Sequence, residues 1–209
     1  MQLLSKYTTH PLTHQLLTAL LKDYKRPNDK IHEWLKNGSL LSIKKGLYIA
    51  GPAIPGNKPE PFLLANHIWG PSYVSVDAAL SHYGLIPERV YEITSMTTKV
   101  SKKFATPAGV FNYIHLPLPY YAFGISQLRF PDNQCSMIAS PEKSLFDKIV
   151  TTSGLILRSA KNVHQYLIED LRIDEQDLRN LDTNMMLEWI NNTPKKQSLE
   201  LLIKTLKTL

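Results

Sequence analysis

The side chains with the clearest chemistry in this sequence are the lysines and arginines of its first 58 residues, a stretch called the head below. The head carries 9 Lys and Arg against 3 Asp and Glu, whereas residues 59–209 carry 15 of each kind. The formal net charge of +6 therefore lies entirely in the head. A basic region beside a neutral body indicates an anionic partner, and duplex nucleic acid is the commonest one.

Three parts of the head are expected to contact DNA. Lys44 and Lys45 lie at the tip of a predicted hairpin, where side chains meet the phosphate backbone. Lys25 and Arg26 lie in the turn before a predicted helix, which is also a usual phosphate position. The exposed face of that helix is expected to enter the major groove. The predicted DNA-binding residues are Lys25, Arg26, Lys30, His32, Lys36, Asn37, Lys44 and Lys45.

Two acidic residues, Asp29 and Glu33, lie on the same helix face as the expected base contacts. A carboxylate can accept a hydrogen bond from cytosine N4, but it also repels phosphate. The competing interpretation is therefore a non-enzymatic protein-interaction module whose head is merely basic. A steep dependence of DNA binding on salt would separate the two interpretations, because neutralised phosphates release counterions.

Catalytic motifs are weak in this chain. Ser140 and Lys143 fit the S-x-x-K nucleophile motif, but Ser42 and Lys45 fit it equally well, and the companion S-D-N and K-T-G elements are absent. A helix capped by Ser140 explains the first match, and a hydrolase using Ser140 and Lys143 is the weaker alternative. The sequence also lacks G-x-S-x-G, Walker A and G-x-G-x-x-G patterns, so no enzymatic activity is expected.

A second cluster contains the residue types of a catalytic triad. Ser75, Asp77, Ser81 and His82 fall within eight residues of one another. Helical geometry puts Ser81 and His82 on different faces, so the expected structure is a short surface helix with an N-cap.

No metal or other cofactor is expected. His10 and His14 are four residues apart, but Pro11 starts the predicted helix between them and leaves His10 outside it. Cys135, the single cysteine, lies in an apolar strand pattern and is expected to be a buried thiol. One cysteine excludes an intramolecular disulfide framework and fits a reducing compartment.

Cytoplasmic localisation without a membrane partner is expected. No apolar run approaches the roughly 18–20 residues of a membrane span, and the N-terminus lacks the apolar core of a signal peptide.

The helices of the head are predicted from apolar spacing and capping residues. Residues 11–21 have helical spacing, and a second helix begins with Asn28 as N-cap and ends before Gly38. Ile31, Trp34 and Leu35 form the face of this second helix that should be buried. The head has room for only two clear helices before the hairpin.

A hairpin and a linker complete the head. Strands are predicted at residues 40–43 and 47–50, with Gly46 at positive φ in the turn. Two helices followed by this hairpin are the layout of a winged helix-turn-helix. Residues 51–61 hold four prolines and two glycines, which indicates a stiff linker that few contacts cross.

The remaining sequence predicts a mixed part followed by a helical part. The predicted elements are helices at about 62–69 and 76–83, strands at 90–98, 104–106, 110–116 and 135–139, and a helix starting at Ser140. Beyond residue 151 only helices are predicted, at about 160–171, 174–181, 183–191 and 195–208.

Three stretches in the same order resemble the AbiEi-type antitoxin family. Residues 44–49 (KKGLYI) resemble the family's wing, and residues 71–88 resemble the segment that follows it. Residues 139–147 (ASPEKSLFD) resemble a later helix of the family, with Ser144 where alanine is usual. The resemblance covers about residues 15–150.

The resemblance implies a transcriptional regulator and antitoxin of a type IV, AbiE-like toxin–antitoxin pair. In that family the winged helix binds inverted repeats upstream of the operon and represses it. The following domain counteracts a nucleotidyltransferase-like toxin and needs no stable complex with it. The family's antitoxic residues are not carried over to this chain.

The expected fold is α+β, in three parts. Residues 1–58 are a winged-helix DNA-binding domain. Residues 59–150 are an AbiEi-like domain with a small, mostly antiparallel sheet. Residues 151–209 are a helical region packed on the middle domain. The expected function is autorepression through DNA binding, combined with an antitoxin role.

Overall fold

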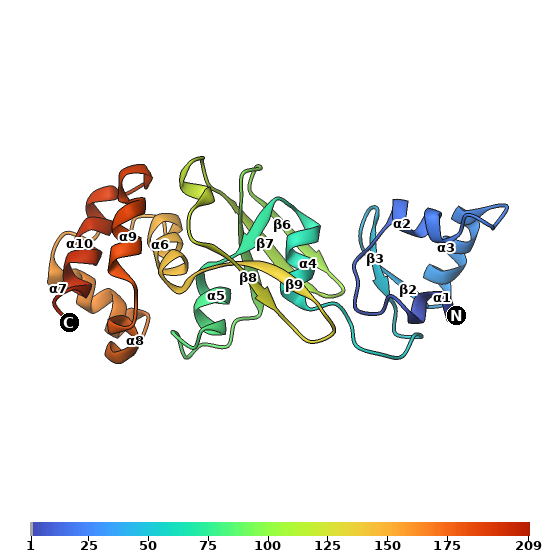
Figure 1. Ribbon diagram of the computed structural model, residues 1–209, viewed down its shortest axis with the longest axis horizontal. Coiled ribbons are helices and arrows are strands. Elements are labelled where there is room, and N and C mark those ends of the chain that lie inside the picture. Colours follow the sequence, from blue (N-terminus) through green and yellow to red (C-terminus); the bar gives the residue numbers. More distant parts are fainter. Residues whose placement is uncertain (1) are drawn as a thin grey trace.

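The computed structural model describes residues 2–209 and shows an elongated molecule with the head at one end (Figure 1). A six-stranded sheet with its helices forms the middle, and the C-terminal helices form the other end. The described residues contain ten α-helices, an antiparallel three-stranded sheet and a mixed six-stranded sheet. The mixed α+β class is therefore confirmed.

The head contains one helix more than its sequence predicts. Helix α1 is short, and the predicted helix at residues 11–21 begins only at His14, because Leu12 and Thr13 pair with the last strand of the head. The Thr13 hydroxyl accepts from the Leu16 N–H and caps the helix. The elements are α1 (Gln2–Ser5), β1 (Leu12–Thr13), α2 (His14–Leu20), α3 (Pro27–Lys36), β2 (Leu40–Lys44) and β3 (Leu47–Ala50), with the sheet order β1–β3–β2.

Helix α3 follows the predicted pattern apart from its first residues. Its N-cap is Arg26 rather than Asn28, and Pro27 occupies the first helical position, where a missing N–H costs nothing. Gly38, at φ +74°, follows the C-cap residue, as predicted. Ile31 and Trp34 are buried, with Trp34 only 4% exposed, so the inward face of the helix is confirmed.

The hairpin β2–β3 takes part in two hydrophobic clusters. Successive side chains of a strand point to opposite faces. In β3, Ala50 and the partly buried Tyr48 pack in the core of the head, whereas Leu47 and Ile49 pack against the middle part. The core of the head comprises Leu4, Leu12, Leu17, Leu21, Ile31, Trp34, Leu40, Ala50 and Ile54.

The cluster on the other side of the hairpin crosses the proline-rich linker. Its hairpin members pack with Leu64, Ala65 and Ile68 of helix α4 (Pro61–Ile68) and with the large sheet. The prediction of few contacts across the linker was therefore wrong. A composition rich in proline indicated an extended segment, but it carried no information about the apolar faces that this segment brings together.

The middle sheet is mixed. Three strand pairs are antiparallel (β4–β5, β6–β7 and β8–β9) and two are parallel (β4–β9 and β5–β7). Strands β4 and β8 were not among the predicted strands. The order is β6–β7–β5–β4–β9–β8, formed by β4 (Ser72–Val74), β5 (Glu92–Thr97), β6 (Lys102–Thr106), β7 (Gly109–His115), β8 (Ile125–Arg129) and β9 (Cys135–Ala139).

Two further helices connect this sheet to the C-terminal end of the molecule. Helix α5 (Val76–His82) packs against helix α6 (Pro141–Thr151). Most of α5 is buried, including Ala78, Ala79 and Leu80. The expectation of a short surface helix was therefore wrong, because its apolar residues are covered on one side by α6 and on the other by the sheet.

The C-terminal part is helical, as predicted. One large cluster runs from Tyr73 and Met96 of the sheet to Leu199 and Leu202 of the last helix. The elements are α7 (Ala160–His164), a π-helix (Gln165–Asp170), α8 (Glu175–Arg179), α9 (Thr183–Trp189) and α10 (Lys196–Leu206). Within residues 2–209, no helix has the length and apolar character needed to cross a bilayer.

Candidate nucleic-acid interface

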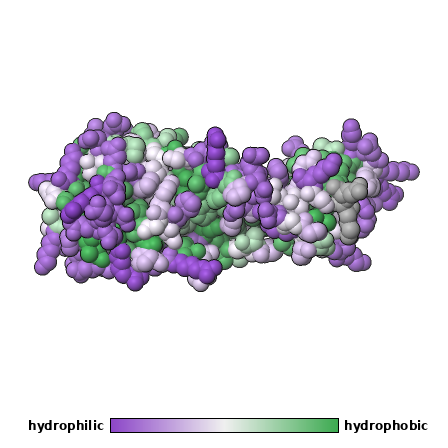
Figure 2. All heavy atoms as spheres, turned by 60° about the horizontal axis from the view of Figure 1, so that its bottom comes forward, coloured by the Kyte–Doolittle hydropathy of each residue, from purple (hydrophilic) through white to green (hydrophobic). Residues whose placement is uncertain are grey.

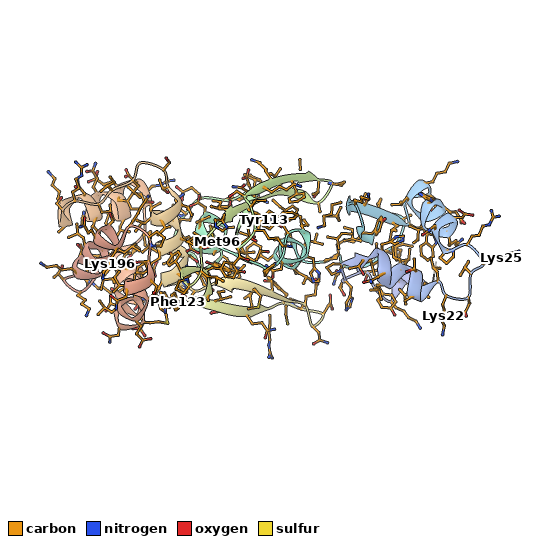
Figure 3. All side chains as sticks on the ribbon, turned by 90° about the horizontal axis from the view of Figure 1, so that it is seen from above. Lys22, Lys25, Met96, Tyr113, Phe123 and Lys196 are labelled. Atoms are coloured by element: carbon orange, nitrogen blue, oxygen red, sulfur yellow. The ribbon has the colours of Figure 1, made fainter. Side chains whose placement is uncertain are left out.

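The candidate residues of the head fall into two electrostatic groups. Lys25, His32, Lys36 and Lys45 are exposed, and no hydrogen bond or ion pair involves their side chains within the described part of the chain. Lys25 and Lys22 lie at the free end of the head, as the labels in Figure 3 show. Figure 2 shows hydrophilic side chains projecting from this same end.

The other group is paired within the head. Arg26 lies 3.7 Å from the carboxylate of Asp29, and Lys30 donates to Glu33 at 2.8 Å. The hydrogen bond to Glu33 raises the pKa of Lys30 above its ordinary value of 10.5. The two acidic residues on the outer face of α3 thus each pair with a neighbouring cation. Both pairs are exposed, so each holds its partner only weakly.

Asn37 has a local role at the end of α3. Its side-chain oxygen accepts from the Ser39 N–H at 3.0 Å, while its own N–H donates to the Glu33 carbonyl. The amide nitrogen of the side chain has no hydrogen-bond partner among residues 2–209.

The two lysines of the hairpin tip have different surroundings. Lys45 is exposed, whereas Lys44 is partly buried and donates a hydrogen bond to the Ile68 carbonyl at the end of α4. The Lys44 ammonium also lies 5.9 Å from the centre of the Trp69 ring. Burial lowers the pKa of Lys44, and the nearby Lys99 and Lys102 lower it further. Lys99 and Lys102 were not among the predicted site residues.

The most polar site in the interior lies away from the head, around Asp147. Both Asp147 and Lys143 are fully buried on α6, four residues apart, with 2.8 Å between the ammonium and the carboxylate. The carboxylate also accepts from Tyr73 at 3.0 Å, Ser75 at 2.7 Å and Tyr120 at 2.8 Å. Four donors thus satisfy one buried carboxylate, which is the condition for keeping an ion pair in a protein interior.

The lysine of this pair is held from three sides. Its ammonium donates to the Tyr120 carbonyl at 3.1 Å and lies 3.3 Å from the centre of the Tyr120 ring. Burial lowers the pKa of Lys143, and the contact with Asp147 opposes that shift. Burial also raises the pKa values of Tyr73 and Tyr120, and the charge of Asp147 adds to this effect. Both hydroxyls therefore remain protonated donors to the carboxylate.

The S-x-x-K match has a structural explanation. Ser140 is the N-cap of α6, and its hydroxyl accepts from the Lys143 N–H at 3.2 Å. The Lys143 ammonium is used by Tyr120 and Asp147, as described above. The predicted helix cap is confirmed.

The triad-like residues near α5 have separate partners. Ser75 donates to Asp147, and Asp77 pairs with Lys148 at 2.7 Å. Ser81 donates to the Glu88 carbonyl at 2.9 Å, and His82 is exposed with its ring against Phe62. These residues do not form a hydrogen-bonded relay with one another.

Two other expectations concern metals and the cysteine. Among residues 2–209, no group of three or more His, Cys, Asp or Glu side chains could hold a metal ion. Cys135 is only partly buried, so the prediction of a buried thiol was wrong. It shares a face of strand β9 with the exposed Met137, whereas Ser136 and Ile138 point inward. The apolar run therefore indicated the strand correctly but not which of its faces is covered.

Comparison with other proteins adds no relative: neither the protein-family models nor the curated protein sequences give a match. The functional argument therefore depends on the residues themselves. The observation with most consequence is that, among residues 2–209, several cations of the head have no internal partner, whereas the buried Lys143 is fully paired.

Proposed function

We propose that this protein is a DNA-binding transcriptional autorepressor and the antitoxin of a type IV, AbiE-like toxin–antitoxin pair, acting in the cytoplasm. The observation that carries the proposal is the head, where exposed and unpaired cations lie on α3, in the turn before it and at the hairpin tip. A phosphate backbone supplies the anions that such a surface lacks.

The arrangement of the head supports a winged helix-turn-helix. The elements run helix, strand, helix, helix, strand, strand, and the sheet order is β1–β3–β2. In such a domain α3 would lie in the major groove, presenting His32, Lys36 and Asn37, while Lys45 would reach a phosphate. By the resemblance to the AbiEi-type family, the DNA site would be inverted repeats upstream of the protein's own gene.

The antitoxin role is supported by the resemblance of residues 139–147 to a helix of the AbiEi-type family. The polar residues of that stretch have clear structural purposes here, since Ser140 caps α6 while Lys143 and Asp147 form the buried pair. Proteins that share this middle fold would need the same residues for the helix cap and the buried pair. The toxin would be a nucleotidyltransferase-like protein, opposed without a stable complex.

A protein-interaction module with a merely basic head is the second candidate. It is favoured by the internal pairing of Arg26 and Lys30, and by the hydrogen bond that turns Lys44 toward the middle part. These cations are partly compensated already. The two candidates differ in their expected response to salt.

The test is binding of the full chain to duplex DNA from upstream of its gene and to an unrelated duplex, over a range of salt concentrations. Replacing Lys36 and Lys45 with alanine should weaken binding and flatten the log–log salt slope by about two. The matched control replaces Lys161 and Lys207, which are also exposed but lie at the far end of the molecule. Unmeasurable binding of the parent, or equal slopes for both variants, would favour the interaction module.

The antitoxin role is tested separately in cells. The full chain should protect against a nucleotidyltransferase-like toxin encoded next to its gene, while a reporter records repression. The Lys36→Ala/Lys45→Ala variant should lose repression and keep protection, because its middle and C-terminal parts are unchanged. Loss of both activities in a folded variant would place the antitoxin function in the head.

A further inference from the structure

A fixed aromatic ring lies where the hairpin meets the middle part. Trp69 is the residue that ends helix α4, and its indole N–H donates to the Val100 carbonyl at 3.1 Å. Its ring also lies 5.7 Å from that of Phe104 in strand β6. These contacts hold the indole in one orientation, partly exposed at the surface.

Three lysines from two separate segments gather around this ring. Lys44 comes from the hairpin of the head, and its ammonium lies 5.9 Å from the ring centre. Lys99 and Lys102 come from the loop before β6 and the first residue of that strand, each with its ammonium 5.0 Å from the ring centre. The face of an indole attracts ammonium groups, so the ring positions these cations but does not neutralise them.

No carboxylate compensates this cluster. None of the three lysines forms an ion pair within the described chain, and Lys99 and Lys102 are exposed. The pKa of Lys44 is lowered first by burial, and the charges of Lys99 and Lys102 lower it further. The next residue, Lys103, is different: it points to the other side of β6 and pairs with Glu92 at 2.5 Å.

We propose that Lys44, Lys99 and Lys102 bind a phosphodiester of duplex DNA beside Trp69, so that the DNA contact continues from the hairpin onto the middle part. This inference rests on the proposed function, because it takes DNA binding by the head as given. Three convergent ammonium groups without an internal acid match an anionic oxygen cluster. The site is continuous with the hairpin tip, where Lys45 adjoins Lys44 and faces solvent.

The experiment measures duplex binding by the full-length Lys99→Ala/Lys102→Ala variant. Affinity for the upstream duplex and for an unrelated duplex should fall by the same factor, about tenfold, and the salt slope should flatten by about two. Phosphate contacts carry no sequence information, so the ratio of the two affinities should not change. The matched control, Lys103→Ala, alters the neighbouring paired lysine and should leave both slopes unchanged.

The outcomes distinguish this inference from the function on which it rests. If Lys36→Ala/Lys45→Ala weakens binding while Lys99→Ala/Lys102→Ala behaves like the parent, the head binds DNA and the second site is wrong. If the parent binds no duplex, both proposals fail. Thermal melting of each variant serves as the folding control, and the exposed positions of Lys99 and Lys102 predict unchanged melting.

A further arm identifies the source of the phosphate. Inorganic triphosphate is titrated into the full-length parent while tryptophan fluorescence is recorded, with Trp69→Phe to assign the signal. If the Lys99→Ala/Lys102→Ala variant loses triphosphate binding but keeps full duplex affinity, the site holds a free phosphate compound and the DNA assignment is overturned. Loss of duplex affinity in that variant supports it.

Discussion

Lys143 in the middle part and Lys44 at the hairpin show two ways in which a folded chain accommodates a lysine. Lys143 is fully buried, and its ammonium pairs with the carboxylate of Asp147. Three hydroxyl groups also donate to that carboxylate. Lys44 is only partly buried, and the charges of two further lysines, Lys99 and Lys102, oppose its protonation. The charge of Lys143 is neutralised by a carboxylate inside the protein. Lys44 lies in a cluster of lysines that forms no ion pair within the described residues.

This difference indicates which charges serve the fold and which are available to a partner. A buried charge without compensation costs several kcal/mol, so Lys143 requires Asp147. A solvated cluster of like charges costs far less, because water screens it. Such a cluster persists without an internal anion, and it gains most from an external one.

The largest expected effect concerns the buried pair. Replacing Asp147 with alanine should lower the free energy of unfolding by about 4–5 kcal/mol, because Lys143 would remain buried without its partner. Urea unfolding of the full chain measures this change. A loss below about 1 kcal/mol would mean that the pair contributes no more than an exposed one.

A double replacement sharpens the same point. Lys143→Met combined with Asp147→Leu removes both charges and should be less destabilising than Asp147→Ala alone, since no uncompensated charge remains. A double variant at least as unstable as the single one would show that the hydroxyl donors of Tyr73, Ser75 and Tyr120, and not the lysine, create the need for Asp147.

A smaller effect is expected for the lysine of the hairpin. Lys44→Met removes one hydrogen bond to the Ile68 carbonyl but also relieves repulsion by Lys99 and Lys102. The free energy of unfolding should therefore change by no more than about 1 kcal/mol. Affinity for duplex DNA should fall several-fold in the same variant. Large destabilisation would place Lys44 with Lys143 as a structural lysine.

The lowered pKa of Lys44 predicts that DNA affinity falls a few-fold at alkaline pH. A lysine whose pKa falls on folding favours the folded state above its ordinary pKa, and this contribution is lost as the pH falls through the lowered value. Phosphate favours the charged form, so DNA affinity should decline as the pH rises from neutral toward 10.5. Lys44→Arg keeps its charge throughout and should show a weaker decline. Identical pH profiles would remove Lys44 from the interface.

The smallest effect is expected for an exposed pair with the same spacing as the buried one. Glu175 and Arg179 are also four residues apart on a helix, at 2.5 Å, but both side chains are about half exposed. Glu175→Ala should change the free energy of unfolding by less than about 0.5 kcal/mol. Thermal unfolding of the Glu175→Ala and Asp147→Ala variants, measured side by side, tests this contrast. Comparable losses of stability in the two variants would contradict the role assigned to burial.

The sequence predicts local structure well where a short pattern determines it. Trp34 is buried because helical spacing puts it beside Ile31, and Gly38 ends α3 because it can adopt a positive φ. Ser140 caps its helix for an equally local reason. Such features depend on a few neighbouring residues, and a single sequence contains all of them.

Features that join distant segments were not predictable in the same way. Tyr73 and Ser75 reach Asp147 across more than 70 residues, and no spacing rule connects them. The cluster around Trp69 was hidden for another reason: a zero net charge over residues 59–209 averages out a local excess. The run from Lys99 to Lys103, with three lysines in five residues, was the available signal.

The sharing of the hairpin between two hydrophobic clusters limits where this chain can be recombined. A chimera joined within residues 51–61 would separate Leu47 and Ile49 from Leu64 and Ile68, and so leave apolar surface open on both fragments. Helix α4 packs in turn against strands of the large sheet, whose Val74, Phe111 and Ile138 belong to the same cluster. An exchangeable unit must therefore carry the head, helix α4 and the large sheet together.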